Sequence, residues 1–170
     1  ENDIKRAQDE LPQSAAGKTI MTTEPKFIPN EAARIMLKED IPVSVRLIDC
    51  VGYIVDSSLG YVEDNEPRMV TTPWFEHPIA FNEAAEIGTK KVICEHSTIG
   101  LVVTTDGTIT EIDRNDYVDA ENRVINELKA INKPFIVLLN SVAPNSQSAQ
   151  NLKAELEAKH GVPVVAVNCE

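Results

Sequence analysis

Hydrophobic positions along this chain alternate with polar ones in one segment and form unbroken runs in others. Val43, Val45 and Leu47 alternate with polar residues, and this period of two predicts a strand that ends at Asp49. Three later runs are almost continuously apolar, which is typical of strands buried on both faces of a sheet. They span residues 100–107 with a closing turn, 135–140 and 162–167.

Prolines mark the less regular parts of the chain. Residues 20–36 have strand-forming side chains, but Pro25 and Pro29 interrupt them, so they predict an edge strand. Residues 53–81 contain Gly60 and several prolines and predict a long irregular segment, which in a compact domain is usually functional or mobile. Residues 1–19 are polar and predict the end of a helix followed by a loop.

A period near 3.6 predicts three helices, one before the first buried strand and one in each interval between the buried strands. They cover residues 82–96 with Asn82 as N-cap, residues 118–131, and residues 146–160 with a stop at Gly161. Strands and helices then alternate as strand–helix–strand–helix–strand. This order predicts an α/β fold with a doubly wound, mostly parallel sheet and an antiparallel edge strand.

Composition limits the classes of function. The 170 residues are 42% apolar and 25% charged, which fits a single domain over 1–170. The net charge of −11 argues against a nucleic-acid partner but leaves a nucleotide ligand open. Cys50, Cys94 and Cys169 lie far apart, so we expect no disulfide or zinc site and a reducing cytoplasm. We also expect no transmembrane segment and no signal peptide.

The first candidate site is the DxxG pattern formed by Asp49 and Gly52 at the end of a predicted strand. In GTPase-like switches the Asp carboxylate orients Mg²⁺ through its water shell, and the Gly N–H meets the γ-phosphate, where a Cβ would clash. An Asp at a strand end also serves as a turn or helix cap. The pattern alone does not separate the two interpretations.

A threonine pair lies one strand earlier. A hydroxyl from Thr22 or Thr23 could enter the Mg²⁺ shell and sense the γ-phosphate, although threonine is also common at strand starts. The nearby Gly17-Lys18-Thr19 is not the end of a P-loop, because Pro12 stands where the motif needs its first glycine.

Asn140-Ser141-Val142-Ala143 follows the strand over 135–140, where GTPase-like folds carry N-K-x-D. Ala143 cannot accept the guanine hydrogen bonds that the aspartate of that motif accepts, so adenine or no nucleotide is the better expectation. An ordinary turn after a strand explains the same residues. Asp106-Gly107-Thr108 also lies at the expected carboxyl edge of the sheet, where a turn explains it equally well.

Several longer segments together resemble the stage IV sporulation protein A family, the coat-morphogenetic ATPases of spore-forming bacteria. The resemblance covers essentially all 170 residues. The segments that carry it are residues 8–27, 46–53, 73–74, 83–89 and 96–100.

This resemblance implies a GTPase-derived P-loop NTPase fold that hydrolyses ATP with Mg²⁺ and polymerises as a basement layer for the spore coat. Asp49 resembles the Walker-B aspartate, a Mg²⁺ ligand through water. Thr22 and Thr23 resemble the γ-phosphate-sensing threonines, with Thr22 also near the metal. Gly52, Asn140 and Ser141 would contact the nucleotide. The implied partners are further copies of the protein and proteins of the spore coat and forespore surface, in the mother-cell cytoplasm.

Two features of the family are missing from these residues. The P-loop with its strand is absent, and so is the C-terminal assembly region. In the implied fold the P-loop strand lies mid-sheet, between the strands that end at Asp49 and near Asp106, and ATP and Mg²⁺ need that loop. We therefore expect these 170 residues alone to be inactive. The alternatives are a non-catalytic scaffold domain for protein–protein assembly, or a GTPase with a rewritten base site.

Overall fold

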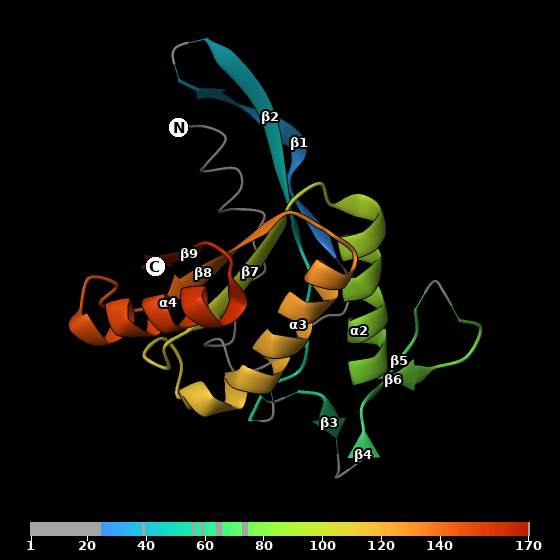
Figure 1. The fold of residues 1–170 in the computed structure, drawn as a ribbon. Helices are drawn as coiled ribbons and strands as arrows, with labels where there is room; N and C mark the ends of the chain where they lie inside the picture. The colour runs from blue at the N-terminus through green and yellow to red at the C-terminus, as the bar shows by residue number, and fades with distance from the viewer. Residues whose placement is uncertain are drawn as a thin grey trace.

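The computed structural model describes residues 25–38, 40–55, 57–58, 60–63, 66–72 and 75–169, and Figure 1 shows how their elements are arranged. They form a mixed α/β structure with one parallel sheet and three antiparallel strand pairs. The mixed architecture confirms the α/β expectation.

The first two strands form a long antiparallel hairpin. β1 (Lys26–Leu37) pairs with β2 (Ile41–Asp49), and the register places Lys26 opposite Asp49. A register shift between Ile28 and Ala33 interrupts the pairing close to the proline that the sequence marks as a break. The hairpin projects from the rest of the chain in Figure 1. The predicted antiparallel strand is therefore confirmed.

The three buried strands form a parallel sheet in the order β7-β8-β9. They are β7 (Gly100–Thr105), β8 (Phe135–Asn140) and β9 (Val164–Val167), close to the predicted ranges. A parallel pair needs a crossover, and here α3 (Val118–Ala130) and α4 (Gln147–His160) supply the two crossovers.

Both crossover helices cover the same face of this sheet. The core beneath them contains Val102, Ile125, Leu128, Val137, Leu139, Leu156 and Val164. On the opposite face, Leu101, Val103 and Val165 remain 48%, 61% and 42% exposed. Among the described residues the sheet is thus covered on one side, whereas a doubly wound sheet has helices on both. Among the described residues, helices on one face of the predicted sheet are seen, and helices on the other face are not.

Helix ends follow the capping signals in α4 but not in α2. The Ser146 hydroxyl accepts a bond from the Ala149 N–H at 3.2 Å, and Gly161 ends α4 in the left-handed region at φ 63°. α2 (Phe81–Lys91) instead begins after Ala80 and continues into a π-helical turn, Val92–His96. The prediction of Asn82 as N-cap is therefore wrong. The Phe81 side chain is fully buried, so its packing determines where this helix begins.

The segment over 53–81 is less irregular than its sequence suggests. β3 (Val62–Glu63) pairs with β4 (Glu66–Pro67), and β5 (Met69–Val70) pairs with β6 (Ile79–Ala80), all antiparallel. The Phe81 N–H donates to the Arg68 carbonyl at 2.7 Å, which ties this segment to α2. The expectation of a wholly irregular stretch is corrected by these short pairs.

A buried polar cluster lies between β7, α3 and α4. Glu121 of α3 is 3% exposed, and its two carboxylate oxygens accept bonds from one Arg114 nitrogen at 2.8 and 2.9 Å. Arg114 also approaches the buried Thr104 hydroxyl, at 3.5 Å. His160 is 8% exposed, with its Nε2 4.0 Å from Glu121. Removal of one partner of the Arg114–Glu121 ion pair should destabilise the fold, because it leaves a buried charge without a partner.

His160 makes stability depend on pH. Burial lowers the pKa of His160 below its usual 6.5, Lys159, Lys129 and Arg114 lower it further, and Glu121 raises it. The unfolded histidine therefore binds a proton at a higher pH than the folded one. We therefore expect the stability that depends on an uncharged His160 to be complete above pH about 6.5. The free energy of unfolding should fall as the pH drops below that value.

Urea denaturation of the complete protein between pH 7.5 and 5.5 measures this dependence. His160→Gln should flatten it, whereas the same change at the exposed His96 should leave it intact. Equal pH slopes in the parent and the His160 variant would contradict the assignment.

Candidate functional site

Asp49 lies at the end of β2, where its carboxylate reaches solvent. Partial burial raises its pKa, while the positive charge of Lys26 and a bond from the Cys50 backbone lower it. Lys26 faces Asp49 across the hairpin, so the register of β1 and β2 places this cation beside the carboxylate. An accessible carboxylate at a strand end can bind a hydrated cation.

Gly52 adopts a backbone conformation that favours glycine, with φ at 78°. Its N–H donates to the Thr89 hydroxyl of α2 at 3.0 Å, and that hydroxyl donates to the Gly52 carbonyl at 3.3 Å. Among the described residues, apart from the neighbours of Gly52 in the chain, no atom lies within 4 Å of the place where a Cβ would stand. The glycine is therefore required here for its backbone angle rather than for space.

Cys50 lies in the same loop and is half-buried. Burial raises the pKa of its thiol, and a hydrogen bond with the Thr89 hydroxyl lowers it by less. Thr89 thus contacts two residues of the DxxG loop from α2. The loop is packed against this helix rather than left open to solvent.

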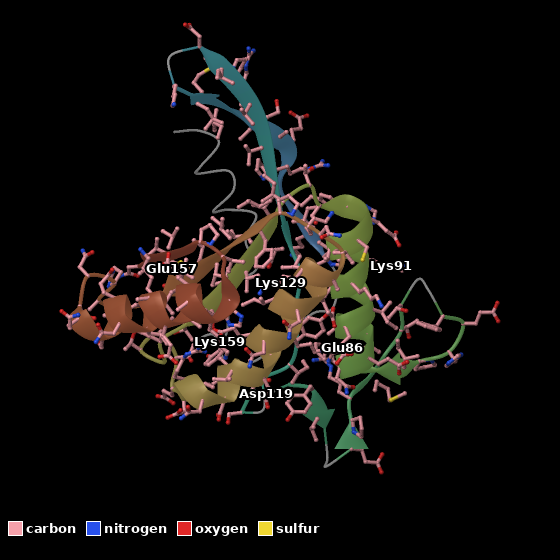
Figure 2. The ribbon with its side chains drawn as sticks, viewed as in Figure 1. Glu86, Lys91, Asp119, Lys129, Glu157 and Lys159 are labelled. Carbon is pink, nitrogen blue, oxygen red and sulfur yellow. The ribbon has the colours of Figure 1, made fainter. Side chains whose placement is uncertain are left out.

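Tyr53 joins the same loop to α3. Its hydroxyl donates to the Glu127 carboxylate, and the Arg123 guanidinium lies over its ring at 4.2 Å from the centroid. Burial and the bond to Glu127 raise the pKa of Tyr53 above its usual value. Arg123 in turn donates to both carboxylate oxygens of Glu86 at 2.7 and 2.8 Å. Figure 2 shows Glu86 between α2 and α3, so this ion pair links the two helices.

A shallow cavity of about 260 Å³ lies beside this link. It is lined by Tyr53, Ile54, Tyr61, Asn82, Glu86, Asp119, Ala120 and Arg123. Figure 2 places Asp119 toward the start of α3, at the end of that helix nearer the cavity. Two charged lining groups, Arg123 and Glu86, already bond to each other, so these guanidinium donors are engaged within the fold.

The carboxyl edge of the parallel sheet brings a second set of polar groups together. Asn140 lies opposite Thr105 in the register, and its side-chain oxygen accepts a bond from the Cys169 N–H at 3.0 Å. Ser141 is fully buried, and its hydroxyl accepts from the Ala143 N–H at 3.1 Å. Asn140 and Ser141, two of the three predicted nucleotide contacts, are thus held by hydrogen bonds within the fold.

Asp106 completes this edge. Burial raises its pKa, but bonds from Ser141 and Thr108 outweigh that effect, so the pKa lies below its usual value. The Thr108 hydroxyl also accepts from the Val142 N–H at 3.0 Å. The loops after β7 and β8 are therefore held to each other.

The predicted site residues fall into separate groups. Asp49 ends β2 and Gly52 lies in the loop after it, whereas Asn140 ends β8 of the parallel sheet and Ser141 follows it. Within the described ranges no hydrogen bond joins the two groups. Thr22 and Thr23 lie outside the described residues. Where side chains are described, no group of three or more His, Cys, Asp and Glu is placed to hold a metal. The same residues contain no helix long and apolar enough to cross a bilayer.

Sequence reasoning missed the residues that hold the DxxG loop in place. Thr89 is a single threonine inside a helix. Arg123 and Glu127 belong to a charged helix face, which predicts only that their side chains are exposed to solvent. No motif marks them. Only the packing of α2 and α3 against the loop identifies them.

Comparison with known proteins gives the class of this chain and then its family. Residues 1–170 match the family described as "Stage IV sporulation protein A, ATPase domain". The chain therefore belongs to the stage IV sporulation protein A family and matches the model of its ATPase domain.

Three relatives illustrate the match. Stage IV sporulation protein A of Bacillus anthracis and that of Bacillus subtilis (strain 168) are each 58% identical over 170 residues, which is 100% of this chain and 35% of theirs. The protein of that name from Clostridioides difficile (strain 630) is 52% identical, over 99% of this chain and 35% of its own. The chain spans about a third of the length of these relatives. No solved structure matches it.

Proposed function

We propose that this chain is part of a nucleotide-hydrolysing domain that, in the complete protein, cleaves the γ-phosphate of ATP with Mg²⁺ and couples this to polymerisation of a spore-coat basement layer. The observation that carries the proposal is the match to an ATPase domain over the whole chain. The DxxG loop, with Asp49 at a strand end and Gly52 at positive φ, supports it.

The donor set fits a magnesium ion that keeps most of its water. Mg²⁺ in nucleotide sites is held by one or two carboxylates or hydroxyls together with phosphate oxygens, not by an all-protein cage. Asp49 is such a carboxylate, and Thr22 is the proposed hydroxyl. When bound, the ion would neutralise charge on the phosphate oxygens. Asp49 would orient its water shell, and Gly52 N–H would bind a γ-phosphate oxygen.

The arrangement of the strands supports a P-loop NTPase fold. Within the described residues, β2 is an edge strand of the β1-β2 pair, and β7 is an edge strand of the β7-β8-β9 sheet. Unpaired ladders of backbone donors and acceptors favour the addition of a strand. We propose that the P-loop strand of the complete protein occupies this position, between the ends at Asp49 and Asp106.

The preference of the complete protein for ATP or GTP tests which nucleotide it uses. With Ala143 in place of a carboxylate, the complete protein should accept ATP at least as well as GTP. Because Ser141 is fully buried and Ala143 is exposed, Ala143→Asp is the better substitution for installing a guanine reader. It should move the ratio of kcat/KM values toward GTP.

The measurement is kcat/KM for both nucleotides in the parent and in the variant. Val142→Asp, next to Ala143 and also exposed, is the matched control and should leave the ratio unchanged. A parent that strongly prefers GTP would show that the base is read elsewhere. A parent that hydrolyses neither nucleotide would support the scaffold alternative.

A further inference from the structure

We propose that Thr89 of α2 is a positioning residue for the DxxG loop: its hydroxyl holds both backbone polar groups of Gly52 and competes with the γ-phosphate for the Gly52 N–H. This inference rests on the proposed function, because the competing acceptor is the phosphate of a bound nucleotide. It adds a residue outside the motif that determines how readily the loop reaches that phosphate.

One hydroxyl can make both bonds at once. It has a single proton to donate and two lone pairs to accept with. The Gly52 N–H donates to Thr89 at 3.0 Å, and Thr89 donates to the Gly52 carbonyl at 3.3 Å. Thr89 is only 2% exposed, so water cannot easily take over either bond. The side chain therefore holds Gly52 against α2.

The same N–H cannot serve two strong acceptors. It carries one proton, and an anionic phosphate oxygen is a stronger acceptor than a neutral hydroxyl. Binding of a γ-phosphate to Gly52 therefore requires loss of the bond to Thr89. The free energy of that bond lowers the affinity for ATP relative to ADP. Space beside Gly52 allows the exchange as far as the described part of the chain is concerned, because none of its atoms beyond the chain neighbours of Gly52 lies within 4 Å of the position of a Cβ.

The next residue in the chain connects this exchange to α3. Tyr53 donates to Glu127 and lies under Arg123, which pairs with Glu86 of α2. Because the Gly52 carbonyl belongs to the peptide bond with Tyr53, loss of its bond from Thr89 frees that peptide and can alter the contact between Tyr53 and Glu127. Release of Thr89 would thereby change contacts on both helices.

Amide hydrogen exchange of the complete protein, without nucleotide, tests the clamp directly. Thr89→Val keeps the shape and removes the hydroxyl, so the segment that contains Gly52 should exchange about 5-fold faster, as expected for loss of a typical hydrogen bond. Thr89→Ser keeps the hydroxyl and should exchange like the parent. Thr89→Ala serves as a second variant without the hydroxyl if the valine protein does not fold.

Nucleotide affinity tests the competition. Titration with Mg-ATP and Mg-ADP gives the ratio of the two dissociation constants, and Thr89→Val should shift it toward ATP by about 5-fold, since the competing acceptor is gone. Thr89→Ser should leave the ratio unchanged. A general loss of folding would weaken both nucleotides equally and would not move this ratio.

Each result decides one step. Equal Gly52 exchange in the parent and in both variants without the hydroxyl overturns the clamp, whatever the nucleotide data show. Faster exchange with an unchanged ATP-to-ADP ratio overturns the competition. A parent that binds neither nucleotide overturns the proposed function and the competition with it, while the exchange measurement still decides whether Thr89 holds Gly52.

Discussion

The Asp49→Ala variant of the complete protein is expected to hydrolyse ATP about 10²-fold more slowly than the parent, or slower still. Under the proposed function this carboxylate orients the water shell of Mg²⁺, and no other Asp or Glu follows it before Gly52. Loss of a charge contact that is strongest in the transition state lowers kcat more than it weakens binding. Steady-state kcat and KM for ATP are the measurements.

Asp40 offers a matched control, because it is an exposed aspartate beside the other end of β2. Asp40→Ala should hydrolyse ATP at the parental rate. Replacement of Thr22 and Thr23 by alanine should spare ATP binding and slow turnover, since a P-loop would hold most of the triphosphate. Parental turnover in the double threonine variant would refute their assignment as phosphate sensors, and parental turnover in Asp49→Ala would refute the magnesium role.

The largest effect on stability is expected at Glu121. Glu121→Gln should lower the free energy of local unfolding of α3 and β7 by about 3 kcal/mol, because it leaves the Arg114 guanidinium without its charge partner in a mostly buried place. The Glu121 side chain is 1% exposed and that of Arg114 is 18% exposed. Amide exchange of the complete protein reports this local free energy.

Glu86→Gln is the matched control. It breaks the Arg123–Glu86 pair, whose side chains are 47% and 37% exposed, and an exposed pair contributes about 1 kcal/mol or less. Replacing Arg114 and Glu121 together by leucine should recover part of the loss, since no unpaired charge then remains. The explanation fails if the Glu121 and Glu86 variants lose equal stability.

The elements that could be predicted are those whose signal is local. The apolar run of β8 and the Ser146 and Gly161 caps of α4 agree with the structure almost residue for residue. The start of α2 was missed because burial of Phe81, not a capping side chain, sets it. The two-residue strands over 62–80 were missed because such short pairs have no periodicity to detect.

The candidate site was predictable only where a motif reports it. Asp49 and Gly52 form the motif on which the site prediction rests, and Gly52 has a positive φ, but their roles toward a nucleotide stay predictions. Thr89 and Arg123 could not be found, since a side chain that acts by packing across two helices leaves no spacing in the sequence. The pairing of Glu121 with Arg114 was not predicted either, because Arg114 lies in the short 3₁₀ turn Arg114–Tyr117 before α3.

The one-sided covering of the parallel sheet has a thermodynamic consequence. The heat capacity of unfolding grows with the apolar surface that becomes wet, and Leu101, Val103 and Val165 are already largely wet in the fold. In the described part of the chain, this term comes mainly from the face beneath α3 and α4. Any segment or partner that covers the other face should therefore bind with a negative heat-capacity change, which calorimetry at several temperatures can detect.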